Sequence, residues 1–518
     1  MKKSAPMTET KKVLIFIRDY ADLGEDKLFL WGDNTLTSVT AQQLVGEAAE
    51  IICHDYWLIA PRIFSSTQQL PITVTDIEEL RISSSGIKRD RESREKTDIS
   101  GALQNFADSD TVKHYIDIFN KKAPIDENVL RTIGEAMLNQ SSKLEADAKE
   151  NNEWERFTKI ERPVAEYLIS SAAAGIAIDS ARLRVHKENI EFDYYMALKK
   201  FSAEYNLPLE LPSNDDIVHR LEPLGYDFSG VDVDYVLNFV PMNDNFAIDL
   251  LNLRKIAKSR NVLNAIPLSQ KRIFPIVDCF GSITSRIYFK DPSLQNLAKH
   301  HRNILIPDDG KVFSYVDYEQ YEAGIMAALS NDETLLTLYA DGDLYKQVAS
   351  GIFQDEERRK EAKRLFLSYA YGMKNRHLID AAFGYGADRR MTKDFFKRFE
   401  TFEKWKISVH ALFETDQRIG TALGNHLRRD GAGPLTEKEK RSAVSQLVQG
   451  TASLIFKKSL IKLRQEPGVS LKVPMHDAIL FEHSHDFDPR LVADVFARTM
   501  TEHFEGKITG KASLSPFR

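Results

Sequence analysis

Two segments far apart in the chain each place an aspartate directly after a run of strand-forming residues. In the first, Val312-Phe-Ser-Tyr-Val316 leads into Asp317, and the second is the turn Met475-His476-Asp477 between two apolar stretches. We expect two strands to flank this turn and to bring Asp477 beside Asp317, which restricts the chain to folds that pair these strands. Carboxylates at strand ends, together with the backbone carbonyl of Tyr318, suit a pair of hard divalent cations and hence phosphoryl transfer. An isolated aspartate in such a place is more often an ordinary turn or cap residue, so the residues between the two segments are decisive.

Between the aspartates lies a segment with a regular four-residue spacing. Arg359, Lys363, Leu367 and Tyr371 form one stripe if the segment is an α-helix, and Gly372 then ends or bends that helix. A stripe of two cations, an apolar residue and an aromatic ring fits a nucleoside triphosphate lying along it. The alternative, with about equal weight for the stripe alone, is an ordinary basic amphipathic helix.

The overall composition excludes several classes of protein. The chain has 518 residues, of which 42% are apolar and 28% charged, as in an ordinary soluble protein with two or more domains. Cys53 and Cys279 cannot form a disulfide framework, and no signal-peptide core or run of about 20 apolar residues occurs. These features predict a cytoplasmic protein that does not enter a membrane. The net charge of −6 argues against indiscriminate coating of nucleic acid but allows a local basic cleft.

Basic residues are concentrated in two places. A first cluster of ten lies among residues 254–302, and a second lies in the helical stretch at residues 358–364. The first consists of Arg254, Lys255, Lys258, Arg260, Lys271, Arg272, Arg286, Lys290, Lys299 and Arg302. Each cluster alone is as readily a solvated face, but two clusters around a carboxylate motif predict contacts with a phosphate backbone, for which we single out Arg254 and Lys258.

The pattern along the chain divides it into three zones. Residues 13–17, 27–31, 50–53 and 72–75 are predicted strands, with helices near 101–107 and 127–149, which describes a small α/β domain. The polar run Lys143–Glu155 is predicted to be a long helix or a linker, and we place a boundary there. Residues 158–274 are mostly helical in pattern, and from about Pro275 strands and long helices alternate.

With these residues in view, the chain resembles the family A DNA polymerases, the group that includes bacterial DNA polymerase I and many phage replicases. Asp317-Tyr-Glu-Gln-Tyr-Glu322 is similar to the family motif D-Y-S-Q-I-E, the helix from Arg359 to Gly372 to R-x3-K-x7-Y-G, and His476-Asp477 to the H-D core of a third motif. Further matches are Thr284-Ser285-Arg286, Asp291–Leu297, Arg441 with Gln449-Gly-Thr-Ala452, and Glu161–Asp179. The motifs occur in family order over residues 160–518.

The resemblance implies a fold class and a domain order. The fold is α+β, a right-hand polymerase with an antiparallel palm sheet and helical thumb and fingers, preceded by a small α/β domain like RNase H. The implied segments are an exonuclease-like domain (1–150), the thumb and start of the polymerase region (158–275), palm (276–335), fingers (336–440) and palm again (441–518).

The resemblance also implies site residues, ligands and partners. Asp317, Tyr318 and Asp477 would hold two Mg²⁺ ions, with Mn²⁺ as an alternative, and Lys363 would protonate the departing pyrophosphate. Nucleotide contacts would come from Arg359, Lys363, Leu367, Tyr371, Gln320 and Glu322, the last as a steric gate against a 2′-hydroxyl. Arg286, Arg441, Gln449 and His476 would touch the minor groove or the primer terminus. The implied partners are primer–template DNA and deoxynucleoside triphosphates, for a monomer in a bacterial or phage-infected cell; accessory replication proteins stay open.

Several residues depart from the family pattern. Leu367 replaces an aromatic residue, Ala478 an acidic one, Ser445 an Asn and Ser285 a Gly. Together with the neighbouring residues, Leu367 gives the helix a likeness to phage-type RNA polymerases, whereas Glu322 favours DNA synthesis. Besides a DNA polymerase, the sequence therefore leaves open a polymerase of relaxed sugar selection that makes RNA or primers, and a non-catalytic nucleic-acid-binding relic.

The N-terminal domain occupies the place of the family's 3′–5′ exonuclease but lacks its acidic pattern. Arg18 and Tyr20 stand where a D-x-E would fall, and Phe119 follows Tyr115 where an aspartate is expected. His54-Asp55 and Asp76 are only distantly similar to the later acidic positions. We expect a domain without nuclease activity; the alternative is an active nuclease with displaced motifs.

Overall fold

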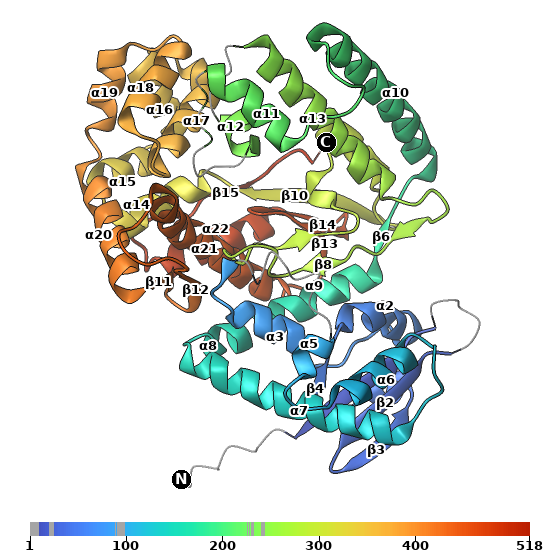
Figure 1. The fold of residues 1–518 in the computed structure, drawn as a ribbon. Helices are drawn as coiled ribbons and strands as arrows, with labels where there is room; N and C mark the ends of the chain where they lie inside the picture. Colours follow the sequence, from blue (N-terminus) through green and yellow to red (C-terminus); the bar gives the residue numbers. More distant parts are fainter. Residues whose placement is uncertain are drawn as a thin grey trace.

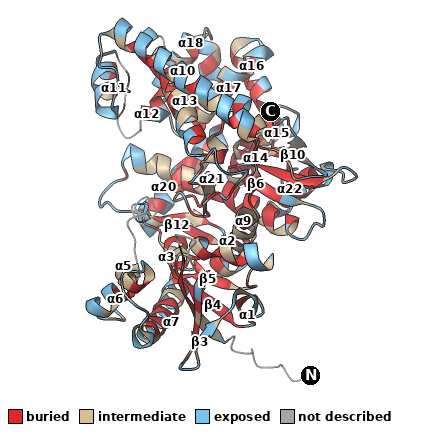
Figure 2. Ribbon diagram, turned by 90° about the vertical axis from the view of Figure 1, so that its right-hand side faces the viewer, coloured by how far each residue is buried: buried red, intermediate tan, exposed pale blue. Residues whose placement is uncertain are grey.

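The computed structural model describes residues 10–19, 25–88, 90, 99–224, 226, 228, 233–239 and 244–517. The N-terminal residues form one layered unit, and the remaining chain surrounds a second sheet that lies above it in Figure 1. Figure 2 shows that the buried residues lie along both sheets and on the inner faces of the surrounding helices. The described helices include none with the length and apolar character that crossing a bilayer needs.

The N-terminal unit is a five-stranded sheet of order β3-β2-β1-β4-β5, in which the first three strands are antiparallel and the last two parallel. Its strands are β1 Lys11–Ile17, β2 Lys27–Gly32, β3 Thr35–Val39, β4 Glu50–Cys53 and β5 Val74–Asp76. Its helices are α1 Ala41–Val45, α2 Tyr56–Thr67, α3 Ile77–Ser84, α5 Ile99–Leu103, α6 Ser109–Phe119 and α7 Glu127–Glu150.

The central strand β1 is buried on both faces, as its unbroken apolar sequence requires. Val13, Ile15 and Ile17 point into a core shared with α6 and α7, whereas Leu14 and Phe16 point to the opposite core with α2. The predicted strands are confirmed with small shifts, since 72–75 is observed at Val74–Asp76. The strand β3 was missed, and the helix predicted near 101–107 ends at Leu103 and is followed by α6.

The polar run Lys143–Glu155 is the end of α7 and the turn after it. The chain continues through α8 Trp154–Arg156, a π-helical turn Phe157–Glu161 and α9 Arg162–Ala174. The α9 helix packs on α2 of the N-terminal unit and on β13 (Ser470–Pro474) of the second sheet, so it connects the two parts by direct contact. The region is therefore a helical connection and not a flexible linker.

The second sheet is antiparallel and has the order β13-β14-β10-β15. It contains β10 Lys311–Tyr318, β13 Ser470–Pro474, β14 Ala478–Ser484 and β15 Ala512–Leu514, and it contacts α14 Tyr321–Ser330, α21 Glu437–Leu463 and α22 Arg490–His503. The ring of Tyr318 packs between Tyr321 and Phe496, which joins the end of β10 to α14 and α22.

Two helical regions lie on either side of this sheet (Figure 1). The first contains α10 Ser180–Tyr205, α11 Asn214–Leu221, α12 Val233–Phe239 and α13 Asn245–Asn264, with a separate apolar core of its own. The 3-10 turn Glu222–Leu224 follows α11. Outside the helices lie two short ladders, β6 Ile176–Ala177 with β7 Arg272–Ile273 and β8 Val277–Asp278 with β9 Tyr288–Phe289, and the 3-10 turns Leu294–Asn296 and Lys299–Ile304.

The second helical region carries the predicted basic stripe. It contains α15 Glu333–Ala340, α16 Leu344–Phe353, a 3-10 turn Glu356–Arg358, α17 Arg359–Ala370, α18 Asn375–Gly384, α19 Arg389–Phe396 and α20 Glu400–Asp416, followed by the hairpin β11 Arg418–Thr421 and β12 Gly424–Arg428. The predicted helix from Arg359 is confirmed as α17. Gly372 follows it with a φ of +94°, a left-handed conformation that ends the helix at little steric cost.

Candidate active site

The two aspartates meet because their strands are neighbours. Two strands flank the turn at Met475-His476-Asp477 as predicted, and β14 pairs with β10 in a register that sets Asp317 opposite Ala478. The backbone N–H of Tyr318 also donates to the carbonyl oxygen of Asp477 at 3.0 Å. Asp317, Tyr318 and Asp477 therefore lie together in the second sheet, where β10 ends and β14 begins.

A bound cation would stabilise the charged forms of the carboxyl groups of Asp317 and Asp477. Burial, with the charge of Asp477 next, raises the pKa of Asp317 to about 7, and burial with the charge of Glu322 raises that of Asp477. Asp317 Oδ1 is buried and has no hydrogen-bond partner among the described residues. An uncompensated buried carboxylate fits a hard cation with oxygen ligands.

The donor set near the pair is small. The described residues contain no group of three or more His, Cys, Asp or Glu side chains able to hold a metal. Two carboxylates and a main-chain oxygen suit Mg²⁺ that takes its remaining ligands from substrate phosphates and water. The positive charge of Lys363 opposes the rise in pKa of both aspartates. The positive charge of Lys299 does the same for Asp317.

Glu322 is held at both carboxylate oxygens. Arg286 Nη2 donates to Oε1 at 2.7 Å, and the hydroxyl of Tyr371 donates to Oε2 at 2.6 Å. Burial and the neighbouring Glu322 raise the pKa of Tyr371 well above its usual range, so its hydroxyl stays a donor. The three predicted site residues therefore form one cluster that joins α14, α17 and the loop before β9.

The two cations of the α17 stripe share an aromatic support. The Lys363 ammonium and the Arg359 guanidinium each lie 5.4 Å from the centroid of the Tyr345 ring. Arg359 Nε also donates to Asp343 Oδ2 at 2.8 Å. Lys363 is exposed and Leu367 half-buried against the core, so the stripe presents charge outward at one end and apolar surface at the other.

Gln320 has a different environment from the one the motif suggests. Its side-chain nitrogen donates to the carbonyl of Gly342 at 3.0 Å, and its side-chain oxygen accepts from the N–H of Leu344 at 2.6 Å. Both ends of the amide are thus engaged with the loop that carries Asp343. In this geometry Gln320 positions the start of α16.

His476 and Gln449 face the same cluster. Burial, then the charges of Arg286 and Lys258, lowers the pKa of His476 to about 4, so its ring is neutral at pH 7. The ring packs edge-on against Tyr288 at 4.9 Å. Gln449, on α21, is near enough to hydrogen-bond the hydroxyl of Tyr371.

Arg441, on the same helix, lines a cavity of about 250 Å³ together with Tyr371 and Gly372. Lys374, Lys406, His410 and Lys440 line it as well.

The first basic cluster is divided between structural and accessible residues. Lys258 and Lys255 line a cleft of about 760 Å³ together with Asn296 and His300. Arg254, by contrast, forms an ion pair with Asp234 at 2.9 Å and donates to Asn214. A phosphate-contacting role is wrong for Arg302, which is buried and donates to the carbonyls of Leu297 and Phe517.

Within the part of the N-terminal domain that the structure describes, no group of three or more His, Cys, Asp or Glu side chains is placed to hold a metal. Asp19 is buried and accepts from Lys121 Nζ at 2.8 Å, so an ammonium compensates its charge. His54 Nε2 lies 2.6 Å from the hydroxyl of Tyr115, and the ring of Phe119 packs against His54 and Phe16. Tyr20, part of the predicted degenerate motif, lies outside the described residues.

Sequence reasoning missed four residues of this site. They are Tyr288, Lys299, Asp343 and Tyr345, which contact or act on predicted site residues. Only Lys299 carried a signal, as a member of the basic cluster. The others lie outside the quoted motifs, and only the packing of α16 and of the β9 region brings them close.

Comparisons with known proteins identify the family of the chain. The model of DNA polymerase family A matches residues 231–514, more than half of the chain. The thermostable DNA polymerase I of Thermus thermophilus is 24% identical over 379 residues, which cover 65% of this chain and 45% of that protein. The DNA polymerase I of Helicobacter pylori is 22% identical over 532 residues, or 94% of this chain and 58% of the relative. The chain belongs to DNA polymerase family A.

A solved structure supports the fold over nearly the whole chain. The POL domain of Pol1 from M. smegmatis, in complex with DNA primer-template and dNTP, superposes with a TM-score of 0.72 at 19% identity and covers 98% of this chain and 95% of that one. The predicted α+β right-hand polymerase fold is therefore confirmed. The chain spans about half the length of the curated relatives that it matches.

Proposed function

We propose that the protein is a template-directed DNA polymerase that adds deoxynucleotides to a primer 3′ end. The observation that supports this most is the pair Asp317 and Asp477, which has an Asp317 oxygen without a hydrogen-bond partner among the described residues and the positive charge of Lys363 close by. Two Mg²⁺ ions, or Mn²⁺, bound by Asp317, Asp477 and the Tyr318 carbonyl would activate the primer 3′-hydroxyl and neutralise the leaving pyrophosphate.

The chain's own residues would bind and orient the substrates. Arg359 and Lys363, backed by Tyr345, would bind the triphosphate, and Lys363 would donate a proton to the leaving pyrophosphate. Leu367 and Tyr371 would lie against the incoming base and sugar. Glu322, fixed by Arg286 and Tyr371, would exclude a 2′-hydroxyl and so select deoxynucleotides.

The partners in this proposal are primer–template DNA and deoxynucleoside triphosphates. Lys258, His476, Arg441, Gln449 and Arg286 would contact the duplex near the primer terminus, where minor-groove acceptors are common to all base pairs. Arg254 would reach DNA only after leaving Asp234. We propose that the protein acts as a monomer in the cytoplasm of a bacterial or phage-infected cell.

We also propose that the enzyme does not proofread. Two-metal nuclease chemistry requires several carboxylates around each ion, whereas here Lys121 neutralises Asp19 and the ring of Phe119 packs against His54. A primer with a mismatched 3′ end, incubated with Mg²⁺ and no nucleotides, should remain intact. Its shortening by the wild type, and not by a variant with Asp55 and Asp76 replaced by Asn, would show an active nuclease.

Primer extension tests the main proposal. With Mg²⁺ and deoxynucleotides the wild type should extend a primer, and Asp477→Ala or Asp317→Ala should lower the rate at least about a thousandfold, because each removes a ligand that no neighbour replaces. Asp308→Ala is the matched control, since this half-exposed carboxylate pairs with Arg272 away from the aspartate pair. Ribonucleotides used as well as deoxynucleotides would instead indicate RNA or primer synthesis, and no extension with either would indicate a non-catalytic binding protein.

A further inference from the structure

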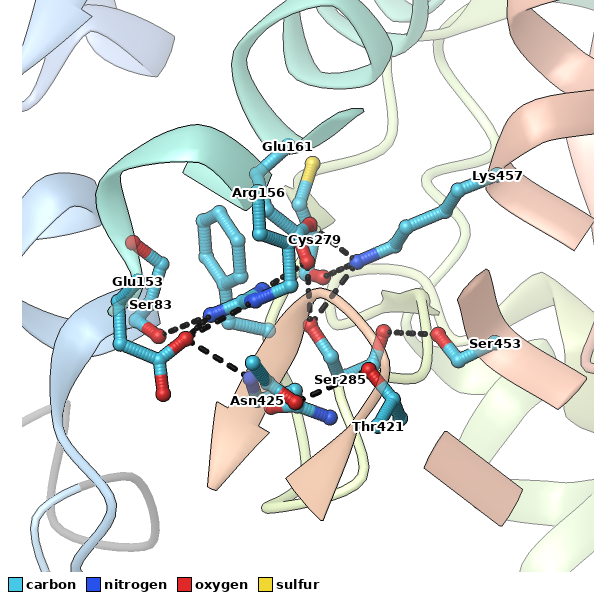
Figure 3. Close-up of polar contacts among 12 residues, drawn as sticks. Ser83, Glu153, Arg156, Glu161, Cys279, Ser285, Thr421, Asn425, Ser453 and Lys457 are labelled. Carbon is cyan, nitrogen blue, oxygen red and sulfur yellow. Dashed lines mark hydrogen bonds and ion pairs between the residues drawn. The ribbon is translucent and has the colours of Figure 1, made fainter. Parts of the chain in front are cut away.

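Four buried charges connect the N-terminal domain to α21 and to the loop before Arg286 (Figure 3). They are Glu153, Arg156, Glu161 and Lys457, and each side chain is only 1–2% exposed. Arg156 donates to both glutamates, and Lys457 Nζ donates to Glu161 Oε2. Arg156 also donates to the carbonyl of Ser83 in α3. Two acids and two bases alternate, so the chain of charges is neutral as a whole.

Stability alone does not account for such a cluster. Removing each charge from water costs several kcal/mol, and replacement of buried ion pairs by apolar residues is often neutral or stabilising. Burial raises the pKa of Glu161, but Lys457 and Arg156 outweigh burial and bring it below its usual value. Burial lowers the pKa of Lys457, and the charge of Glu161 opposes this shift, so the two charges depend on each other. The hydrogen bonds between these side chains are directional, which suits a role in fixing the geometry of a neighbour.

That neighbour is Ser285. Its hydroxyl donates to Glu161 Oε1 at 3.0 Å and accepts from Lys457 Nζ at 3.0 Å, while its carbonyl accepts from Ser453 Oγ at 2.5 Å. Ser285 has a φ of +61°, a left-handed conformation that costs a non-glycine residue about 1 kcal/mol or more. Its backbone depends on these contacts to remain in this conformation.

The next residue is Arg286, whose guanidinium holds Glu322. The loop before it has further anchors on α21, because Gln446 donates to the carbonyl of Ile283 at 3.3 Å and Lys457 to that of Cys279 at 2.9 Å. Gln446, Ser453 and Lys457 are spaced by seven and four residues, so they lie on one face of the helix. This face fixes the backbone from which Arg286 reaches Glu322 at 2.7 Å.

We propose that Glu161 and Lys457 are positioning residues for sugar selection: through Ser285 they orient Arg286 on Glu322, the residue that excludes a 2′-hydroxyl. The inference rests on the proposed function of Glu322 in a DNA polymerase. It assigns the N-terminal connection a role in the polymerase site, because Arg156 ties the same cluster to Ser83.

The test measures kcat/KM for a deoxynucleotide and for the matching ribonucleotide in the full-length protein. The double variant Glu161→Met with Lys457→Met removes both charges at once, keeps the cluster neutral and replaces the side chains by apolar ones of similar length. We expect it to fold with a thermal midpoint near that of the wild type. Its preference for deoxynucleotides should fall about tenfold, because Arg286 loses the support that orients a charge-assisted hydrogen bond.

Two further variants separate positioning from general damage. Ser285→Gly removes the steric cost of the left-handed backbone and also removes the hydroxyl. It should therefore lower the preference for deoxynucleotides without destabilising the fold. Lys462 lies on the same helix as Lys457 and forms an exposed ion pair with Glu502 of α22, so Lys462→Met should leave the preference unchanged.

Two outcomes would overturn the inference. One is a folded double variant with the wild-type preference, and the other is an equal loss of kcat/KM for both sugars, which is the effect of general damage. Failure of the proposed function is distinguishable, because the wild type would then extend no primer, or would use both sugars equally, before any variant is made.

Discussion

Tyr345 shows how a buried residue outside the motifs supports an exposed site. Its ring is 2% exposed and lies under both Arg359 and Lys363, while Asp343, two residues earlier, pairs with Arg359. A cation over an aromatic ring gains about 0.5–2 kcal/mol, depending on how far it is removed from water. The ring therefore limits the directions in which the two cations point before a triphosphate arrives.

At this position we predict a specific effect on nucleotide binding. Tyr345→Leu should raise KM for the nucleotide about five- to thirtyfold with a smaller change in kcat, because two cation–aromatic contacts of about 0.5–1 kcal/mol each are lost. Tyr345→Phe keeps the ring and is the matched control, so its KM should stay within twofold. Steady-state primer extension measures both, and an equal KM for the two variants would contradict a role for the ring.

At the scale of elements, the N-terminal sheet and α7 approach each other closely at one residue. Gly134 in the middle of α7 faces Trp31 on β2, and a Cβ at this position would lie 2.5 Å from Trp31 Cγ and 2.8 Å from its Cβ. These atoms are near the backbone of β2 and have little freedom to move. The absence of a side chain at Gly134 thus sets the distance between the helix and the sheet.

Gly134→Ala should destabilise the N-terminal domain. The gain in helix propensity is about 1 kcal/mol, whereas overpacking of a tight contact costs about 1–3 kcal/mol, so we expect a net loss of about 1 kcal/mol. Gly46→Ala is the control, because a Cβ there meets only carbonyl oxygens at 3.6 and 3.7 Å. Thermal unfolding followed by circular dichroism measures the difference, and a stabilised Gly134→Ala variant would contradict the close contact.

At the scale of the whole molecule, one carboxylate joins the N-terminal part to the hairpin β11–β12. Glu153 accepts from the N–H groups of Asn425 and His426 and from His426 Nδ1, at 2.8, 3.0 and 2.8 Å. Burial alone would raise its pKa, but the hydrogen bond with His426 and the charge of Arg156 outweigh burial and lower the pKa to about 2. The unfolded chain has the ordinary value of 4.5 for this group.

This difference predicts the response of the fold to acid. The stabilisation from Glu153 is fully present above about pH 4.5 and is lost as the pH falls toward 2, because the unfolded chain takes up the proton first; it amounts to about 3 kcal/mol. Glu153→Gln should therefore unfold at a lower temperature than the wild type at pH 7, with the gap narrowing toward pH 2.5. Glu155→Gln, in an exposed pair with Lys159, should follow the wild type, and a constant gap for Glu153→Gln would refute the assignment.

The local pattern of the sequence was sufficient for the elements that carry the site. Alternating and continuous apolar runs predicted β1, β10 and the two strands around Asp477, because strand burial leaves a period of two or an unbroken apolar run in the sequence. The four-residue spacing from Arg359 to Tyr371 predicted α17, since the stripe is a property of the helix itself. Asp317 and Asp477 were predicted to be neighbours because each follows a run of strand-forming residues and the two strands around Asp477 were expected to pair with the strand before Asp317.

Contacts between distant segments depended on the tertiary structure. Tyr345, Asp343 and the cluster around Glu161 and Lys457 have no local pattern, because their partners lie up to about 300 residues away in sequence and are chosen by packing. Arg254 and Gln320 belong to patterns that predict ligand contacts. In this structure Arg254 forms an ion pair with Asp234, and Gln320 is hydrogen-bonded to the loop at Gly342. A sequence states which charges are available, and only the folded chain determines which of them remain for a ligand.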